Sequence, residues 1–271
     1  SQSGDGGNVG ISIGRTGGTG GSAGDVFASS DGTVSTIGER SHGLFAQSIG
    51  NGGGNSSSTS VSLTTPASGD DKGDTFSLSV GLEGGTGGVS GYASGQNSAQ
   101  ITTGGDRAIG ILAQSIGGAG GTGGFEKRGS SALSIAKNTL KGSEIGTTIS
   151  INIGGDGGDG MTSGDVSVAN DGLLSTIGSN SHGIHAQSAG GGGGSSGVVE
   201  NTLVNLRSTI GTTATLSIGG SGGTGAVSGD VTVANSSDIG TSGLKAAGIY
   251  AQAIGGGGGD AQSVRNIIAG A

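Results

Sequence analysis

The sequence has no Cys and no Trp, a single Pro, and only 2% aromatic residues. Without Cys, the chain has neither a disulfide scaffold nor a thiolate metal site. The scarcity of large apolar side chains argues against a compact globular core, because their burial must offset a cost of roughly 1–2 kcal/mol for ordering each backbone residue. We therefore expect small stacked side chains and backbone hydrogen bonds to hold the fold together.

Basic residues and long apolar runs are also scarce. With 11 Lys and Arg and a net charge of −8, the chain has no basic surface to neutralise phosphate, so we predict no nucleic-acid partner. No apolar run approaches the roughly 18 residues of a membrane span, so this segment is not expected to insert into a membrane. The chain begins without Met and without a signal peptide, and we expect it to be a fragment of a longer protein.

Glycine is what the sequence has in abundance, with 69 residues of 271. Such a composition is close to that of disordered low-complexity chains. However, Ile and Val recur at fixed positions and the mean hydropathy is −0.03, which favours a folded chain.

Two sequence signatures alternate along the chain, and each occurs four times. The first reads SIGRTGGTGGSAGDV at 12–26, SVGLEGGTGGVSGYA at 79–93, NIGGDGGDGMTSGDV at 152–166 and SIGGSGGTGAVSGDV at 217–231. The second reads HGLFAQSIG at 42–50, IGILAQSIG at 109–117, HGIHAQSAG at 182–190 and AGIYAQAIG at 247–255. DGTVSTIG at 31–38 and DGLLSTIG at 171–178 lie between them.

The register of these copies is constant. The first glycines of the first signature are Gly14, Gly81, Gly154 and Gly219, and the glutamines of the second are Gln47, Gln114, Gln187 and Gln252. Glycine and glutamine are 33 residues apart in every copy (47 − 14, 114 − 81, 187 − 154, 252 − 219). We define the repeat cores as 12–50, 79–117, 152–190 and 217–255, separated by variable inserts at 51–78, 118–151 and 191–216.

Within each core the pattern indicates short strands. Runs such as Asp165–Ala169, Leu173–Ile177 and Gly183–Ala189 alternate β-branched and small residues and are bounded by turn residues. We predict an all-β parallel β-helix (β-solenoid) built from four imperfect repeats of ~68 residues with Gly-rich turns, and two to three coils per repeat. A β-sandwich has the same strand spacing. Gly190–Gly194 and Gly255–Gly259 also allow polyglycine helices, either throughout or as local segments inside the solenoid.

The inserts differ from the cores in composition. Segment 56–74 is rich in Ser, Thr and Asp and contains Pro66, and segment 125–145 carries Lys127, Arg128, Lys137 and Lys141. Segment 197–210 has apolar residues at helical spacing, so it is either a short amphipathic helix or one more extended coil. Inserts at a fixed place in a repeat lie on one face, which is often the binding face.

Aspartates are the first candidate site residues. GGDGGDGMT at 154–162 fits a nonapeptide pattern of calcium-binding β-rolls, but the other copies lack Asp156 and Asp159, which favours an ordinary Asp-Gly turn. Asp25, Asp165 and Asp230 recur in SGD, with Tyr92 in the second copy. Paired carboxylates can hydrolyse glycosides, but a repeated residue before each strand is more typical of a turn.

Histidines and glutamines are the remaining candidates. His42 and His182 are replaced by Ile109 and Ala247 in the other copies, and His185 aligns with bulky residues, so we interpret all three as surface or packing residues. The regular glutamines form either a ladder that contacts a glycan or structural amides that satisfy the backbone, and we favour the second. GRTGGTGG resembles a phosphate loop without the Lys that such loops need. We predict no catalytic, cofactor-binding or metal-ligating residue, no cofactor and no enzymatic activity.

SHGLFAQSIGNGGG at 41–54, NIGGDGGDGMTSGDV at 152–166 and NDGLLSTIG at 170–178 together resemble repeats of very large autotransporter passengers (type V secretion) of Gram-negative bacteria. The resemblance covers the chain apart from its inserts, and the second copy departs from it with NSAQITTG and RAIG. It implies a right-handed β-helix, displayed outside the cell by a C-terminal outer-membrane β-barrel that this sequence lacks. The absence of Cys agrees with passage through such a barrel.

The resemblance also implies a function. Many such passengers act as adhesins or biofilm factors, so we expect a structural and adhesive segment, with the inserts carrying recognition. The expected partners are a host-cell surface, extracellular matrix or glycan, and self-association between cells is a further expectation. A β-helical polysaccharide-acting enzyme and a ligand-free stalk of a longer fibre are the alternatives, because fold does not fix function.

Overall fold

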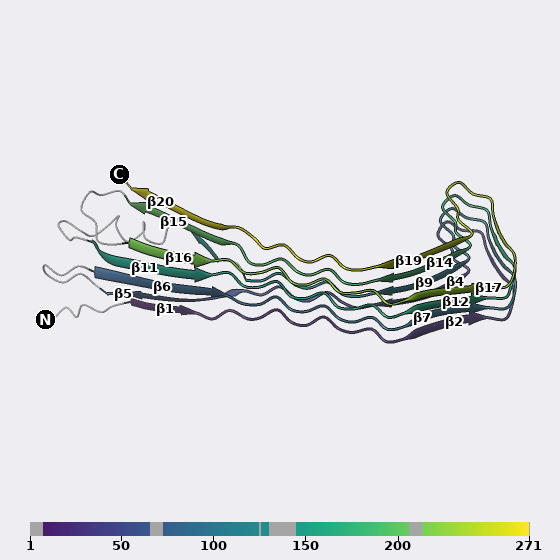
Figure 1. The fold of residues 1–271 in the computed structure, drawn as a ribbon, viewed down its shortest axis with the longest axis horizontal. Coiled ribbons are helices and arrows are strands. Elements are labelled where there is room, and N and C mark those ends of the chain that lie inside the picture. Colours follow the sequence, from purple (N-terminus) through teal and green to yellow (C-terminus); the bar gives the residue numbers. More distant parts are fainter. Residues whose placement is uncertain (1–7, 66–72, 125, 130–144, 206–212, 271) are drawn as a thin grey trace.

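The computed structural model describes residues 8–65, 73–124, 126–129, 145–205 and 213–270. These residues form an elongated all-β structure without a helix. The strands labelled in Figure 1 run along the long axis of the molecule, and the successive copies are stacked across it. Three regions follow one another along this axis, and we call them the base, the arm and the head.

The head consists of three four-stranded parallel sheets, and each copy contributes one strand to each sheet. The first sheet contains β2 (Val26–Ser30), β7 (Ala93–Asn97), β12 (Val166–Asn170) and β17 (Val231–Asn235). The second contains β3 (Val34–Thr36), β8 (Ile101–Thr103), β13 (Leu174–Thr176) and β18 (Ile239–Thr241). The third contains β4 (Leu44–Ile49), β9 (Ile111–Ile116), β14 (Ile184–Ala189) and β19 (Ile249–Ile254).

The sequence correctly predicted parallel sheets, but it predicted the wrong number of coils per copy. The chain passes through each head sheet once per copy, so the expectation of two to three coils per repeat is wrong. The register matches the sequence copies, since Gln47 pairs with Gln114, and Gln187 with both Gln114 and Gln252.

The core of the head lies between its sheets. Alternate strand residues point inward, so that Ile111, Leu174, Ile184, Val166 and Val168 are almost completely buried. Buried alanines belong to the same core cluster as these branched side chains. This packing explains why β-branched and small residues alternate in each copy.

The arm joins the head to the base through segments that are rich in glycine and are not strands. The outbound segments are 13–25, 82–92, 154–165 and 219–230, and the return segments are 50–57, 117–124, 190–198 and 255–263. We predicted Gly-rich turns, and this prediction is wrong for these residues, because they form extended segments instead (Figure 1).

Hydrogen bonds in the arm recur at every third residue. Gly17 and Gly20 donate their N–H groups to the carbonyl oxygens of Glu83 and Thr86 in the next outbound segment, over 3.0 and 2.8 Å. A second series passes between the layers, in which Gly54 donates to Gly18 and Gly85 donates to Gly54. A repeat of three residues with bonds only between segments is the arrangement of polyglycine helices of the polyproline-II type.

Glycine is required in the arm for lack of space. A Cβ on Gly84 would lie 2.6 Å from the carbonyl carbon of Gly121 in the opposite layer, and one on Gly85 would lie 2.6 Å from that of Gly18 in the preceding copy. The third residue of each triplet, such as Thr86, faces outward. Local polyglycine segments inside a β-fold, one of the alternatives considered above, therefore describe the arm.

The base contains the remaining strands, and its topology is mixed. Its larger sheet has the order β1-β5-β6-β11-β16, and its smaller sheet has the order β10-β15-β20. The larger sheet contains β1 (Asn8–Ser12), β5 (Ser58–Thr64), β6 (Gly73–Gly81), β11 (Ile145–Ile153) and β16 (Thr213–Ile218). The smaller contains β10 (Glu126–Gly129), β15 (Val199–Asn205) and β20 (Val264–Gly270).

The first copy departs from the parallel pattern in the base. Its return strand β5 lies antiparallel between β1 and β6, whereas the return strands of later copies form their own parallel sheet. The fold is therefore not parallel throughout. Strand β15 shows that the extended alternative is right for 199–205, while residues 206–210, Pro66, Lys137 and Lys141 lie outside the described residues.

Candidate functional site

The outer face of the third head sheet presents columns of side chains that repeat from copy to copy. Because β4, β9, β14 and β19 pair in register and alternate residues face outward, each outward position forms a column of four side chains. One column is Phe45, Leu112, His185 and Tyr250, the next is the four glutamines, and the third is Ile49, Ile116, Ala189 and Ile254.

The glutamine column is a continuous amide ladder. Nε2 of Gln47 donates to Oε1 of Gln114 over 2.9 Å, Gln114 to Gln187 over 3.0 Å, and Gln187 to Gln252 over 3.1 Å. The favoured structural interpretation is therefore right about a structural amide, but the partner is the neighbouring glutamine and not the backbone. The glutamines of the second and third copies each use one N–H and one oxygen lone pair in the ladder, which leaves further hydrogen-bonding capacity on this face.

The first column gathers aromatic rings beside this ladder. The rings of His182 and Tyr250 stack with their centroids 5.2 Å apart, and His185 meets Tyr250 edge-on at 4.9 Å. In the first copy, His42 lies 5.6 Å from Phe45. Phe45 is 50% exposed and Tyr250 is 40% exposed, so rings at both ends of the column reach solvent.

The histidines of the first and third copies have a structural role. Nδ1 of His42 accepts the N–H of Ile109 over 3.1 Å, and Nδ1 of His182 accepts the N–H of Ala247 over 3.0 Å. Each histidine thus satisfies the equivalent residue of the next copy, which explains why His alternates with apolar residues at this position. Partial burial lowers the pKa of both imidazoles, and their neutral form is the one that can accept these bonds.

His185 lies on the outer face, as the sequence indicated, but it is half-buried among other rings. Burial lowers the pKa of its imidazole, and the nearby His182 and His42 lower it further. Its Nε2 is buried without a hydrogen-bond partner among the described residues. Sequence reasoning placed this side chain in a bulky column and did not predict its contacts with His182 and Tyr250.

The aspartates of the arm accept hydrogen bonds from the next copy. Oδ1 of Asp159 accepts both the N–H and the hydroxyl of Thr224, over 2.7 and 2.8 Å, and these bonds lower the pKa of its carboxyl. Asp156 binds Ser221 in the same way. The Asp-Gly turn expected here is wrong, because the residues lie in an extended segment and satisfy N–H groups that would otherwise face solvent.

The aspartates of the SGD motifs also accept hydrogen bonds from the next copy. Oδ1 of Asp25 accepts the N–H of Tyr92 over 2.9 Å, and Oδ1 of Asp165 accepts the N–H of Asp230 over 2.8 Å. They lie in one column at the junction of arm and head. Within the part of the chain that the structure describes, no three His, Asp or Glu side chains are grouped so that they could hold a metal ion.

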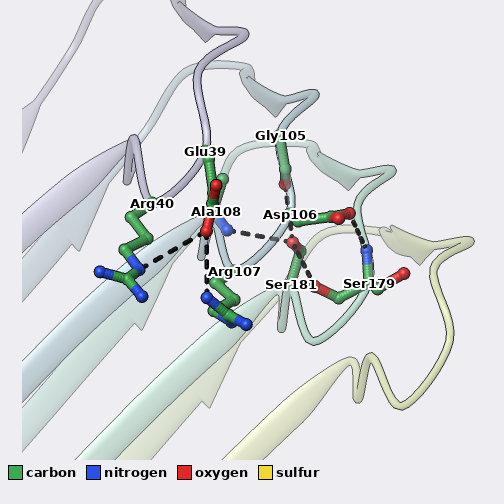
Figure 2. A network of polar contacts seen from close by, with 8 residues as sticks. All are labelled: Glu39, Arg40, Gly105, Asp106, Arg107, Ala108, Ser179 and Ser181. Atoms are coloured by element: carbon green, nitrogen blue, oxygen red, sulfur yellow. Dashed lines mark hydrogen bonds and ion pairs between the residues drawn. The ribbon is translucent and has the colours of Figure 1, made fainter.

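A polar network joins the loops between the second and third head strands (Figure 2). Arg107 bridges to Glu39 over 3.0 Å, and Arg40 lies 3.7 Å from the same carboxylate. The Ser181 hydroxyl donates to the carbonyl of Gly105 and accepts the N–H of Ala108. Arg40, Arg107, Asn180 and Lys245 occupy one position in the four copies and share a left-handed φ of 55–57°. These exposed ion pairs fix the loop positions and contribute little free energy.

A shallow hollow also lies on the larger base sheet. It is lined by Leu63, Phe76, Ile149 and neighbouring residues. Its carboxylate, Asp74, already accepts the N–H of Thr147 over 2.7 Å. The described residues that line this hollow offer apolar contact and no paired carboxylates.

No family model, no curated protein and no solved structure matches this chain. Among the described residues, the structure contains no helix of the length and hydropathy needed to cross a membrane.

Proposed function

We propose that this chain is a structural and adhesive segment of a bacterial autotransporter passenger, displayed outside the cell and anchored through an outer-membrane β-barrel. It acts without catalysis and mediates attachment or biofilm formation. Its partners are a host-cell surface, extracellular matrix or glycan, and self-association between cells is included. The parallel stack is a right-handed β-helix of four repeats, in keeping with the strong preference of parallel crossovers for the right hand.

The observation that carries the proposal is the outer face of the third head sheet. Its amide ladder runs beside a column that contains Phe45, His185 and Tyr250, so hydrogen-bonding groups and apolar rings repeat side by side. Neighbouring strands of a sheet are about 4.8 Å apart, so each column repeats at that interval. A repetitive polymer such as a glycan can contact several columns at once, and many weak contacts then add up to firm attachment.

The test compares adhesion of beads coated with the chain to cell monolayers and to immobilised matrix glycans. Phe45→Ala combined with Tyr250→Ala removes both exposed rings of this face. Phe27→Ala is the matched control, because Phe27 is 71% exposed on the first head sheet. We expect the paired substitution to reduce adhesion and the control to leave it unchanged.

A second variant tests the expectation from the sequence, that the inserts carry recognition. It replaces 66–72, 130–144 and 206–212 with short Gly-Ser links and keeps every described strand. If adhesion is lost only in this variant, recognition belongs to the connections and not to the head. If no version adheres while all remain folded, the segment is a stalk and the adhesive proposal is wrong.

A further inference from the structure

The larger base sheet, at the end of the molecule away from the head, has one apolar face and one polar face (Figure 1). Its five strands pair in register, so each level across the sheet is a row of five side chains. One row is Ile11, Val61, Leu78, Ile151 and Leu216. The row two residues away contains Phe76 and Ile149 and is also entirely apolar, whereas the adjacent rows consist of Ser, Thr, Asn and Gly. Because alternate residues of a strand point to opposite sides, the two apolar rows share one face, which we call the base face.

The molecule leaves the base face to solvent and buries the polar face. On the base face, Phe76 is 38% exposed and Ile149 is 39% exposed. On the polar face, Asn152 is completely buried, and Ser217 of the same row donates its hydroxyl to Asn266 of β20 over 2.8 Å, so the smaller sheet covers this side. A sheet with one buried face ordinarily turns its apolar residues toward the core, and a register shift of one residue would exchange the two faces. The base face therefore has the composition of a buried surface.

This exposure does not come from the edges of the sheet. Phe76 lies on β6 and Ile149 on β11, which are the third and fourth of the five strands and have a paired strand on each side. A further strand added at either edge would pair with β1 or β16 and widen the sheet. It would not lie over the face, so the apolar rows of the inner strands would stay open.

The size of the base face decides what kind of contact it supports. Five strands about 4.8 Å apart, with a mean length of roughly seven residues at about 3.3 Å each, cover about 550 Å². Burial of this area on two molecules removes about 1,100 Å² from water, which is just above the roughly 1,000 Å² that a specific interface needs and below the standard 1,600 Å². The face is thus large enough for a specific but reversible contact.

The chemistry of the base face favours a flat apolar partner. Its two rows carry no charge and no hydrogen-bonding side chain, so they provide nothing to pair with a charged or polar ligand. Two sheets pack face to face about 10 Å apart when side chains of both inner faces interdigitate. The hollow with Leu63, Phe76 and Ile149 in its lining lies on this face and leaves room for a side chain of an opposing sheet.

From this inverted sheet we propose that a second copy of this chain covers the base face, with β6 of each copy at the centre of the contact. A contact between the same surface of two copies closes on itself, so the product is a two-fold dimer and not a filament. The contact involves the base and not the head, so it does not depend on adhesion by the head.

Charge opposes this association and gives it a signature. The chain carries a net charge of −8, and Asp74 is the charged residue in the lining of the hollow, so two copies repel one another at low ionic strength. Salt screens that repulsion and leaves the apolar contact in place. We therefore expect the dimer to become more stable as ionic strength increases.

The experiment measures sedimentation equilibrium of the whole chain at concentrations on the order of micromolar to millimolar. Phe76→Lys and Phe76→Glu each place a charge at the centre of the contact. Phe27→Lys and Phe27→Glu are the matched controls, because Phe27 is an exposed phenylalanine on a head strand. Phe76→Thr removes apolar area while keeping a β-branched residue in the strand, so it provides a test if the charged variants fail to fold. Circular dichroism and thermal melting identify the versions that fold.

We expect the unaltered chain and both controls to dimerise, and the dissociation constant to rise roughly thirtyfold or more in each charged Phe76 variant. Phe76→Thr should raise it by a smaller factor. An equimolar mixture of Phe76→Lys and Phe76→Glu should dimerise again, because the opposite charges then face each other across the two-fold axis.

Three results would overturn the proposal. The first is an unaltered chain that stays monomeric throughout, including one that instead binds vesicles of neutral phosphatidylcholine through Phe76, because the face would then be a lipid-binding surface. The second is a folded Phe76 variant that associates like its control. The third is a mixture of the two charged variants that stays monomeric, because the contact would then not join like faces. Bead adhesion measures the head separately, so failure of the dimer leaves the proposed adhesive function standing.

Discussion

The arm and the head hold the same four copies in the same register by different means. In the head, Ile111 and Ile184 fill the space between sheets, and alternate residues are free to vary. In the arm, backbones such as those of Gly121 and Gly54 approach so closely that no side chain fits between them. The head therefore tolerates variation at every second residue and the arm at every third. A stacked fold can change its periodicity along its length without losing register, because backbone bonds run from copy to copy in both regions.

The comparison predicts that the largest losses of stability come from adding one methyl group to the arm. A Cβ at Gly121→Ala would lie 2.6 Å from the carbonyl carbon of Gly54, which belongs to a bonded backbone and cannot move aside. We expect a loss above about 4 kcal/mol or failure to fold, as measured by urea unfolding. Thr122→Ala, one residue on and facing outward, should stay within about 0.5 kcal/mol. Equal effects of the two would contradict the close packing of the arm.

In the head the damaging change is the opposite one, the removal of side-chain volume. Ile111 is completely buried among Ala93, Ile101 and Ile184, so Ile111→Ala should cost about 2–5 kcal/mol through lost burial and the cavity left behind. Ile37→Ala is the control, since Ile37 is 89% exposed. Unfolding midpoints that do not separate the two variants would mean that the head core is not packed as described.

A buried amide ladder in the head gives a smaller effect. Nδ2 of Asn170 donates to Oδ1 of Asn235 and to the carbonyl of Gly172, both over 2.7 Å, while its Oδ1 accepts Nδ2 of Asn97. Asn170→Ala should cost about 1–3 kcal/mol, because polar groups are left buried without partners. Asn235→Ala, at the exposed end of the ladder, should cost less in the same urea titration. A larger loss at Asn235 would reverse the order that burial predicts.

The histidines predict a dependence on pH that belongs to the head alone. Burial lowers the folded-state pKa of His42, His182 and His185 below the ordinary 6.5. The unfolded chain therefore takes up protons first, so stability is complete above about pH 6.5 and falls as pH drops toward the folded values. Melting temperatures between about pH 7.5 and 5 should decline. Asp159 does not contribute in this range, because its pKa is lowered from 3.8.

The control for this prediction is a substitution that copies the residue found at the equivalent position of another repeat. His185→Leu introduces the residue that the second copy carries at this position, Leu112. It should reduce the slope of melting temperature against pH without preventing folding. A melting temperature that rises on acidification would show that these imidazoles are not held neutral in the fold.

Sequence reasoning identified the copies, the strands of the head and the register of Gln47 with Gln114, because two-residue alternation and constant spacing fix all three. It missed the arm, although the signal was present: from Gly81 to Tyr92 every third residue varies and most of the others are glycine. A helix with three residues per turn that packs against neighbours on two sides needs glycine at two of every three positions. The third position faces outward and is free to vary.

Other features had no local signal. The partners of Asp159 and His182 lie one copy away, and a carboxylate or imidazole in sequence looks the same whether it binds a ligand or a neighbouring N–H. The antiparallel placement of β5 between β1 and β6 also could not be foreseen, because antiparallel and parallel pairing suit the same alternating residues. Contacts between copies decide both features.

The smallest predicted effect sharpens the comparison, because it separates two reasons for glycine within the arm. At Gly257 an added Cβ would meet nothing within 4 Å, and the backbone is not left-handed. Glycine there only increases the conformational freedom of the unfolded chain, so Gly257→Ala should stabilise the protein by about 0.4–1 kcal/mol. Urea unfolding beside Gly121→Ala gives the measurement, with the same substitution acting in opposite directions in the return segments of the second and fourth copies. If Gly257→Ala destabilises the chain, the arm needs glycine for its conformation rather than for its close packing.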